Sequence, residues 1–119
     1  MAAHHEFGKA GELMAAEWLK IQGFHLIFRN WKYGRYEIDI IASKDDILHI
    51  IEVKSRKDNR FGNPEDWVDR NKWNHMAVAG EGFQNQYPSW TNLQYDILAI
   101  LLTPDSKADF FFIEDVYWW

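Results

Sequence analysis

The sequence predicts an α/β domain in which helices flank a mixed central sheet. Three segments of strand character, Leu26 to Trp31, Tyr36 to Ser43 and Ile47 to Ser55, follow one another with short turns between them, as in an antiparallel meander. A helical pattern precedes them, and another separates them from the apolar run Leu93 to Leu102. The predicted order is α-β-β-β-α-β in one domain, residues 1–119, because a chain of this length holds a single core.

The first helix is expected over residues 6–22, where apolar side chains recur at helical spacing and a glycine follows. The second helix is expected to start at Asn63-Pro64, which offers a cap followed by proline at the first helical position. It should run to about Ala79, because the glycines at 80 and 82 weaken the helical pattern.

Turn residues and apolar patterning define the strands. Tyr33-Gly34-Arg35 is a predicted turn before the second strand, and Lys44-Asp45-Asp46 is one before the third. The segment Leu93 to Leu102 ends in a continuous apolar run, which favours a strand buried on both faces and hence a central position. A short last strand is expected over Asp109 to Ile113.

Composition excludes several classes of protein. The chain has no cysteine, which removes disulfides, thiolate zinc sites and cysteine nucleophiles, and suits a reducing compartment. Its longest apolar run, Ile97 to Leu102, is too short to cross a bilayer, and the N-terminal residues lack the pattern of a secretory signal. We therefore expect a soluble, cytoplasmic protein that does not enter a membrane.

The net charge of −5 is unevenly distributed. Residues 1–72 contain 12 basic and 12 acidic residues, whereas residues 73–119 contain 1 and 6, so the acidity lies in the C-terminal part. If carboxylates of the first part bind a divalent metal, the potential there becomes positive. Electrostatics then permits a nucleic-acid substrate without requiring one.

Three charged residues stand within predicted buried strands: Asp39 in the second, and Glu52 and Lys54 in the third. Strand alternation places Glu52 and Lys54 on one face, and a suitable register would bring Asp39 beside Glu52. Buried charges need mutual pairing, a metal ion or an anionic ligand. Asp39 and Glu52 are the best candidate ligands for Mg²⁺ or Mn²⁺, and Lys54 could orient a water or stabilise developing charge during phosphodiester hydrolysis. An ion pair that only fixes strand register is the alternative.

Glu12 is a further candidate for this site. It lies at the edge of the apolar arc of the first helix, among the small residues Gly8, Ala15 and Ala16, which would allow close approach to the sheet. It could then reach the metal directly or through water. The alternative is a glutamate favoured by the helix dipole.

Several segments in order resemble the YraN-like bacterial family of predicted endonucleases, which belongs to the restriction-endonuclease-like PD-(D/E)XK superfamily and is similar to archaeal Holliday-junction resolvases. The match covers about residues 8–100 and includes Gly8 to Ala15, Gly23-Phe24, Arg29 to Trp31, Glu37 to Ala42, Glu52 to Arg56, Phe61-Gly62 and Tyr95 to Ile97. The resemblance implies the restriction-endonuclease-like α-β-β-β-α-β core with a mixed central sheet. It also implies a site in which Glu12, Asp39 and Glu52 bind the metal and Lys54 completes the catalytic set.

Two features depart from the pattern of that family. Tyr36 stands where the family commonly has glycine, so the pocket mouth could be partly filled. The chain is also acidic where such nucleases tend to be basic.

Four basic residues are candidates for contacts to DNA phosphates. Arg56, Lys57 and Arg60 follow the third strand directly, and solvated loop charge is the alternative for them. Lys72 lies on the apolar face of the second helix, where a lysine that extends its stem over the core is the simpler interpretation.

The aromatic C-terminal segment, Phe110 to Ile113 and Val116 to Trp119, needs cover. The first helix could supply it, or a second subunit in a homodimer. For the whole chain we expect a metal-dependent protein that cleaves DNA, including branched or junction DNA. The alternatives are a nuclease-fold module that binds nucleic acid or protein without cutting, and a structural interaction module.

Overall fold

The computed structural model describes residues 2–56, 69–105 and 107–116, with side chains from residue 9 onward. The elements are α1 (Ala2–Ile21), β1 (His25–Tyr33), β2 (Tyr36–Lys44), β3 (Ile47–Arg56), α2 (Arg70–Gln86), β4 (Leu93–Leu102) and β5 (Ala108–Ile113). This order confirms the predicted α/β fold class and the short strand that ends it.

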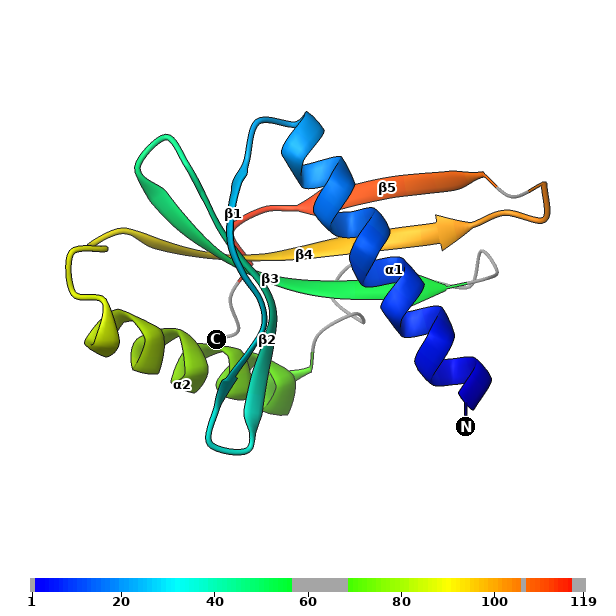
Figure 1. Ribbon diagram of the computed structural model, residues 1–119. Helices are drawn as coiled ribbons and strands as arrows, with labels where there is room; N and C mark the ends of the chain where they lie inside the picture. Colours follow the sequence, from blue (N-terminus) through cyan, green and yellow to red (C-terminus); the bar gives the residue numbers. More distant parts are fainter. Residues whose placement is uncertain (1, 57–68, 106, 117–119) are drawn as a thin grey trace.

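The strands form one mixed sheet in the order β1-β2-β3-β4-β5 (Figure 1). β3 pairs with β4 in parallel, and every other neighbouring pair is antiparallel, so the predicted meander is confirmed. The connection from β3 to β4 contains α2, as a parallel pair requires a crossover. β4 lies between β3 and β5, so it is an inner strand as its apolar run requires, while β3 occupies the centre of the sheet that was predicted for β4.

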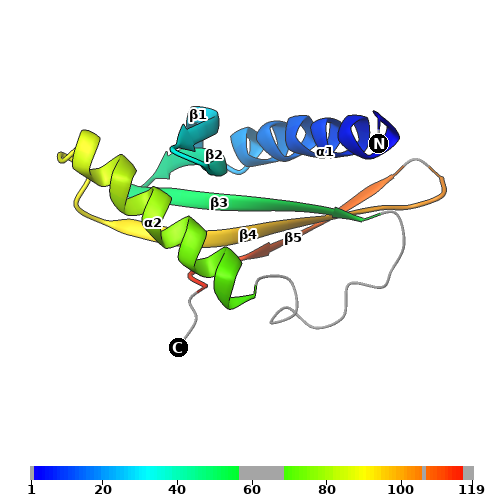
Figure 2. The ribbon, with the colours of Figure 1, turned by 90° about the horizontal axis from the view of Figure 1, so that it is seen from below.

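Each face of the sheet is covered by one helix (Figure 2). On one face, Ala15, Ala16 and Leu19 of α1 pack in a buried cluster with side chains that include Ile51 and Leu98. On the other, Ala79 and Phe83 of α2 pack with side chains that include Ile38 and Ile50. Of the helices described, neither combines the length and apolar character needed for a bilayer crossing.

α2 differs from its prediction at the C-terminal end. Asp69 caps the helix by accepting the Lys72 N–H, while the predicted start at Asn63-Pro64 lies outside the described residues. The predicted end at Ala79 is wrong, because the helix continues to Gln86 through both glycines. A side chain at Gly80 or Gly82 would collide with Tyr95 or Tyr33 respectively. These glycines therefore allow α2 to approach the sheet, and packing outweighs their low helix propensity.

α1 makes a similar close approach at Gly11, whose missing side chain leaves room for Ser55 of β3. A Cβ atom there would overlap Ser55 Oγ. We expect Gly11→Ala to lower the free energy of unfolding by about 1–3 kcal/mol through overpacking, despite the better helix propensity of alanine. Denaturant unfolding of Gly11→Ala, of the double variant with Ser55→Ala, and of the exposed control Glu17→Ala would test this. Partial recovery in the double variant is expected, and wild-type stability of Gly11→Ala would contradict the close approach.

The aromatic side chains of β5 are partly covered by α1. Trp18 stacks on Phe110 with ring centroids 5.4 Å apart and lies 5.8 Å from Phe112. Phe24 meets Phe112 edge-on at 5.6 Å. The predicted cover by the first helix is thus confirmed for these rings. Residues 117–119 lie outside the described part of the chain, and the homodimer stays a prediction.

A buried polar pair ties the residues after β5 to the sheet. His49 Nδ1 lies 2.6 Å from Asp96 Oδ2, and the Asp96 side chain is fully buried. The other oxygen, Asp96 Oδ1, accepts the Asp115 backbone N–H and the Gln94 side-chain amide, both at 2.9 Å. Val116 N donates to the Tyr95 carbonyl at 2.7 Å. The segment beyond β5 is therefore held by hydrogen bonds to β4.

Candidate functional site

The candidate site lies where β2 separates from β3. The two strands pair from Lys44 opposite Ile47, next to the hairpin turn, to Ile40 opposite Ile51, and then diverge (Figure 1). Asp39 and Glu52 are the next residue on each strand. Asp39 Oδ2 accepts the backbone N–H of Val53 at 2.9 Å, which satisfies a donor that has lost its partner strand. The split therefore exposes a carboxylate held rigidly by the sheet.

Glu52 is the buried carboxylate of the site, at 5% exposure. As predicted, Glu52 and Lys54 share one face of β3, while Ile51 and Val53 pack in the α1 cluster. Lys54 Nζ lies 3.7 Å from Glu52 Oε1. Lys72 Nζ reaches the same oxygen from α2 at 3.1 Å. One carboxylate oxygen thus faces two ammonium groups that come from different elements.

Glu12 joins the site from α1 through Asn30. In the amide orientation that suits both neighbours, Asn30 Nδ2 donates to Glu12 Oε2 and Glu37 Oε1, each at 3.0 Å. Asn30 has a φ of 53°, a left-handed conformation that asparagine tolerates better than most residues. One β1 residue with an unusual backbone therefore holds carboxylates from α1 and β2 together.

Oxygen atoms of Glu12, Glu37 and Asp39 lie within 4.8 Å of one another and could hold a metal ion. Of this trio, the sequence pattern singled out Asp39 and Glu12. Glu52 stands apart from this trio, engaged with the lysines. Carboxylate oxygens are the donors that Mg²⁺ and Mn²⁺ prefer, so these residues fit such an ion.

The carboxylates raise one another's pKa values. Burial and the neighbouring Asp39 charge raise the pKa of Glu52 to about 7, against the lowering effect of Lys72 and Lys54. Burial also raises the pKa of Asp39, although the Val53 N–H opposes the shift. Burial and Asp39 raise the pKa of Glu12.

The six charged groups carry a net charge of −2 when all are ionised: four carboxylates, Glu12, Glu37, Asp39 and Glu52, and two ammoniums, Lys54 and Lys72. A divalent cation would balance that charge and ease the repulsion that raises the carboxylate pKa values.

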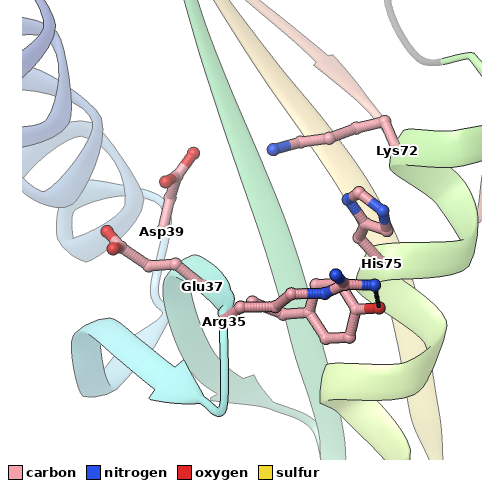
Figure 3. Close-up of a pocket in the computed structure, with 6 residues that line it drawn as sticks. Arg35, Glu37, Asp39, Lys72 and His75 are labelled. Carbon is pink, nitrogen blue, oxygen red and sulfur yellow. Dashed lines mark hydrogen bonds between the residues drawn. The ribbon is translucent and has the colours of Figure 1, made fainter.

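A pocket of about 580 Å³ opens beside Asp39. Figure 3 shows Glu37 and Asp39 on one side and Lys72 and His75 of α2 on the other, with the Lys72 ammonium extended towards Asp39. Tyr36 lines the pocket, its ring 4.6 Å from that of His75, and Arg35 Nη2 donates to the Tyr36 hydroxyl at 3.0 Å. The pocket therefore joins an acidic wall to a cationic and aromatic one.

The structure separates the predicted basic residues. Lys72 belongs to the site itself, because its ion pair with Glu52 goes beyond a lysine that only covers the core. Arg56 is exposed at the end of β3, where it donates to the Ser55 carbonyl, and it is not one of the residues that line the pocket. Lys57 and Arg60 lie outside the described residues. Asn30 was missed as a site residue, and its only signal was its place in the matched segment Arg29 to Trp31.

Fold and site together define a small α/β domain with a carboxylate and lysine cluster at a split between two strands. Residues 11–100 match the family model described as uncharacterised protein family UPF0102. The chain belongs to this family. The matched range includes Glu12, Asp39, Glu52, Lys54 and Lys72.

Similar proteins come from several bacteria. A UPF0102 protein of Phocaeicola vulgatus is 39% identical over 101 residues, which cover 85% of this chain and 84% of the relative. One from Chloroherpeton thalassium is 36% identical over 119 residues, covering 93% and 92% of the two chains. One from Flavobacterium johnsoniae is 38% identical over 112 residues, covering 91% of each. The likeness thus extends over nearly the whole chain.

Proposed function

We propose that this chain is a metal-dependent endonuclease that hydrolyses phosphodiester bonds in DNA, in the manner of the PD-(D/E)XK superfamily and its YraN-like members. The observation that carries the proposal is the convergence of Asp39 with Glu52 and Lys54 at the strand split. A metal-binding carboxylate, a buried carboxylate and an ammonium group in one place match the needs of phosphoryl chemistry.

The cofactor in this proposal is Mg²⁺ or Mn²⁺. Glu12 and Asp39 would hold it at the point where their oxygens converge with Glu37, and Glu52 would join them once it is released from its lysine partners. When bound, such an ion lowers the pKa of its water and polarises a phosphoryl oxygen. Asp39 is fixed by the Val53 N–H, and Glu12 and Glu37 are fixed by Asn30, so the ligands are ordered before binding. Lys54 is placed on the strand edge to orient the attacking water or to stabilise charge on the phosphoryl oxygens.

The proposed substrate is DNA, including branched or junction DNA. Support comes from the wall of the pocket that carries Arg35 and Lys72, which offers cations to a phosphate beside the carboxylates. The net charge of −5 argues for recognition at this local patch rather than over a broad basic surface.

A panel of labelled duplex, single-stranded, flap and four-way-junction DNAs, with Mn²⁺ or with chelator, tests this proposal. We expect cleavage of at least one DNA that needs the metal, and a loss of about 100-fold in rate in Lys54→Ala, the usual cost of removing one electrostatic group from such a site. Lys20→Ala, which removes an exposed lysine of α1, is the matched control and should cleave normally.

Two results would contradict the proposal. Cleavage of equal rate in Lys54→Ala would point to a contaminating nuclease. Metal-independent retardation of the DNAs in a gel, without cleavage of any of them, would select a nuclease-fold module that binds DNA and no longer cuts it.

A further inference from the structure

Lys72 approaches the site from a fixed position. Its backbone N–H donates to the Asp69 cap at 2.8 Å, so the residue sits in the first turn of α2. From there the side chain spans the gap to the sheet and places Nζ 3.1 Å from Glu52 Oε1. The Lys72 side chain is 36% exposed, whereas that of Glu52 is 6% exposed.

In the proposed function, the Glu52 oxygen that Lys72 contacts would complete the metal site formed by Glu12, Glu37 and Asp39. Lys54 already lies 3.7 Å from the same atom, and a divalent cation cannot share it with two ammonium groups without strong repulsion. Lys72 is the more exposed of the two lysines, and it comes from a separate element. It is therefore the group that can leave.

Lys72 competes with a metal ion for the Glu52 carboxylate as a charged ammonium group rather than as a neutral amine. Burial alone would lower its pKa, but the Glu52, Asp39 and Glu37 carboxylates outweigh burial and raise the pKa of Lys72. The ammonium thus supplies part of the positive charge that the carboxylates lack in the absence of a metal.

The pocket offers the displaced ammonium another partner. Lys72 and His75 of α2 line the pocket opposite Glu37 and Asp39 (Figure 3), and Arg35 lines it as well. A phosphate group beside the metal would lie within the reach of this wall. A lysine ammonium binds a phosphate group as a point charge, so Lys72 could pair with a phosphate of the nucleic acid.

We propose that Lys72 is a substrate-binding residue that exchanges partners: it pairs with Glu52 while the metal is absent, and it moves to a substrate phosphate when the metal binds. The inference rests on the proposed function, because it assumes that metal and nucleic acid occupy this site. If Lys72 exchanges partners, metal and phosphate bind cooperatively. Phosphate draws Lys72 away from Glu52 and so frees Glu52 for the metal, and the metal binds Glu52 and so frees Lys72 for phosphate.

Calorimetric titration of Mn²⁺ at mildly alkaline pH tests the exchange. The variant is Lys72→Met, which keeps most of the aliphatic stem. The control is Lys107→Met, which removes an exposed lysine from the turn before β5. Thymidine 5′-monophosphate is the phosphate probe, since it has no phosphodiester to cleave.

We expect Lys72→Met to bind Mn²⁺ alone at least about fivefold more tightly than wild type, the lower end of usual coupling between sites. The probe should tighten Mn²⁺ binding by a similar factor in wild type and in Lys107→Met, and by less than about twofold in Lys72→Met. Unchanged or weaker Mn²⁺ affinity in Lys72→Met, with the effect of the probe retained, would overturn the exchange.

A second measurement uses the wild-type chain and so does not depend on a variant. In ¹⁵N spectra of lysine ammonium groups, the ion-paired Lys72 signal should be present without metal and should shift or vanish with Mg²⁺. A Lys72 signal unchanged at saturating Mg²⁺ would overturn the exchange while leaving the proposed function intact. Failure of wild type to bind Mn²⁺ at all would instead contradict the proposed function.

Discussion

Asp39→Asn is expected to abolish the rise in melting temperature that Mn²⁺ or Mg²⁺ should produce in the wild-type protein. The asparagine oxygen can still accept the Val53 N–H, so the strand split is kept and only the charge is lost. At a metal concentration 100 times Kd, binding contributes about 2.7 kcal/mol, or roughly 8 °C for a domain of this size. Thermal unfolding with and without metal measures this difference.

The control for Asp39→Asn is Asp109→Asn, which removes an exposed carboxylate of β5 far along the sheet from the site. It should respond to metal as the wild type does. A metal-dependent rise that persists in Asp39→Asn would show that the ion binds elsewhere, and the ligand assignment would then be wrong.

Glu52→Gln is expected to flatten the dependence of stability on pH in the absence of metal. The pKa of Glu52 is raised from 4.5 to about 7 in the folded state, so folding favours its protonated form. Its stabilising contribution is complete below pH 4.5 and is lost as the pH rises through 7. The loss is of the order of 3 kcal/mol. The raised pKa values of Asp39 and Glu12 act in the same direction.

Urea unfolding between pH 5 and pH 8 in the presence of chelator checks this prediction. The free energy of unfolding of wild type should fall across the range, that of Glu52→Gln should fall less, and the exposed control Glu17→Gln should follow wild type. Equal slopes in wild type and Glu52→Gln would contradict the raised pKa. Lys72 does not confuse the comparison, because its pKa is raised above 10.5, outside this range.

The strands were predictable because local chemistry and burial agree along them. The turns at Gly34 and at Asp45-Asp46 fall where expected, and the alternation in β3 correctly separates Glu52 and Lys54 from Ile51 and Val53. Asp39, Glu52 and Lys54 come from neighbouring strands of one hairpin. A linear pattern is therefore enough to bring them together.

The features of the fold and site that the sequence did not predict depend on contacts between distant elements. The continuation of α2 through Gly80 depends on the fit of Tyr95 against it, which no local propensity records. Asn30 acts through a left-handed backbone in the middle of a strand, where the pattern predicts an ordinary strand residue. Lys72 reaches Glu52 across a crossover, and its sequence environment is that of a lysine covering the core.

The backbone N–H groups of Asp115 and Val116 donate hydrogen bonds to β4 and hold the C-terminal segment on the sheet. These hydrogen bonds limit where the chain can be shortened in a study of self-association. Deleting everything after Ile113 would strip Asp96 of one of its donors and free the Tyr95 carbonyl, so the shortened chain would melt sooner whether or not it had ever dimerised. Removing only residues 117–119 keeps both hydrogen bonds to β4. A purification handle belongs beyond Val116 for the same reason.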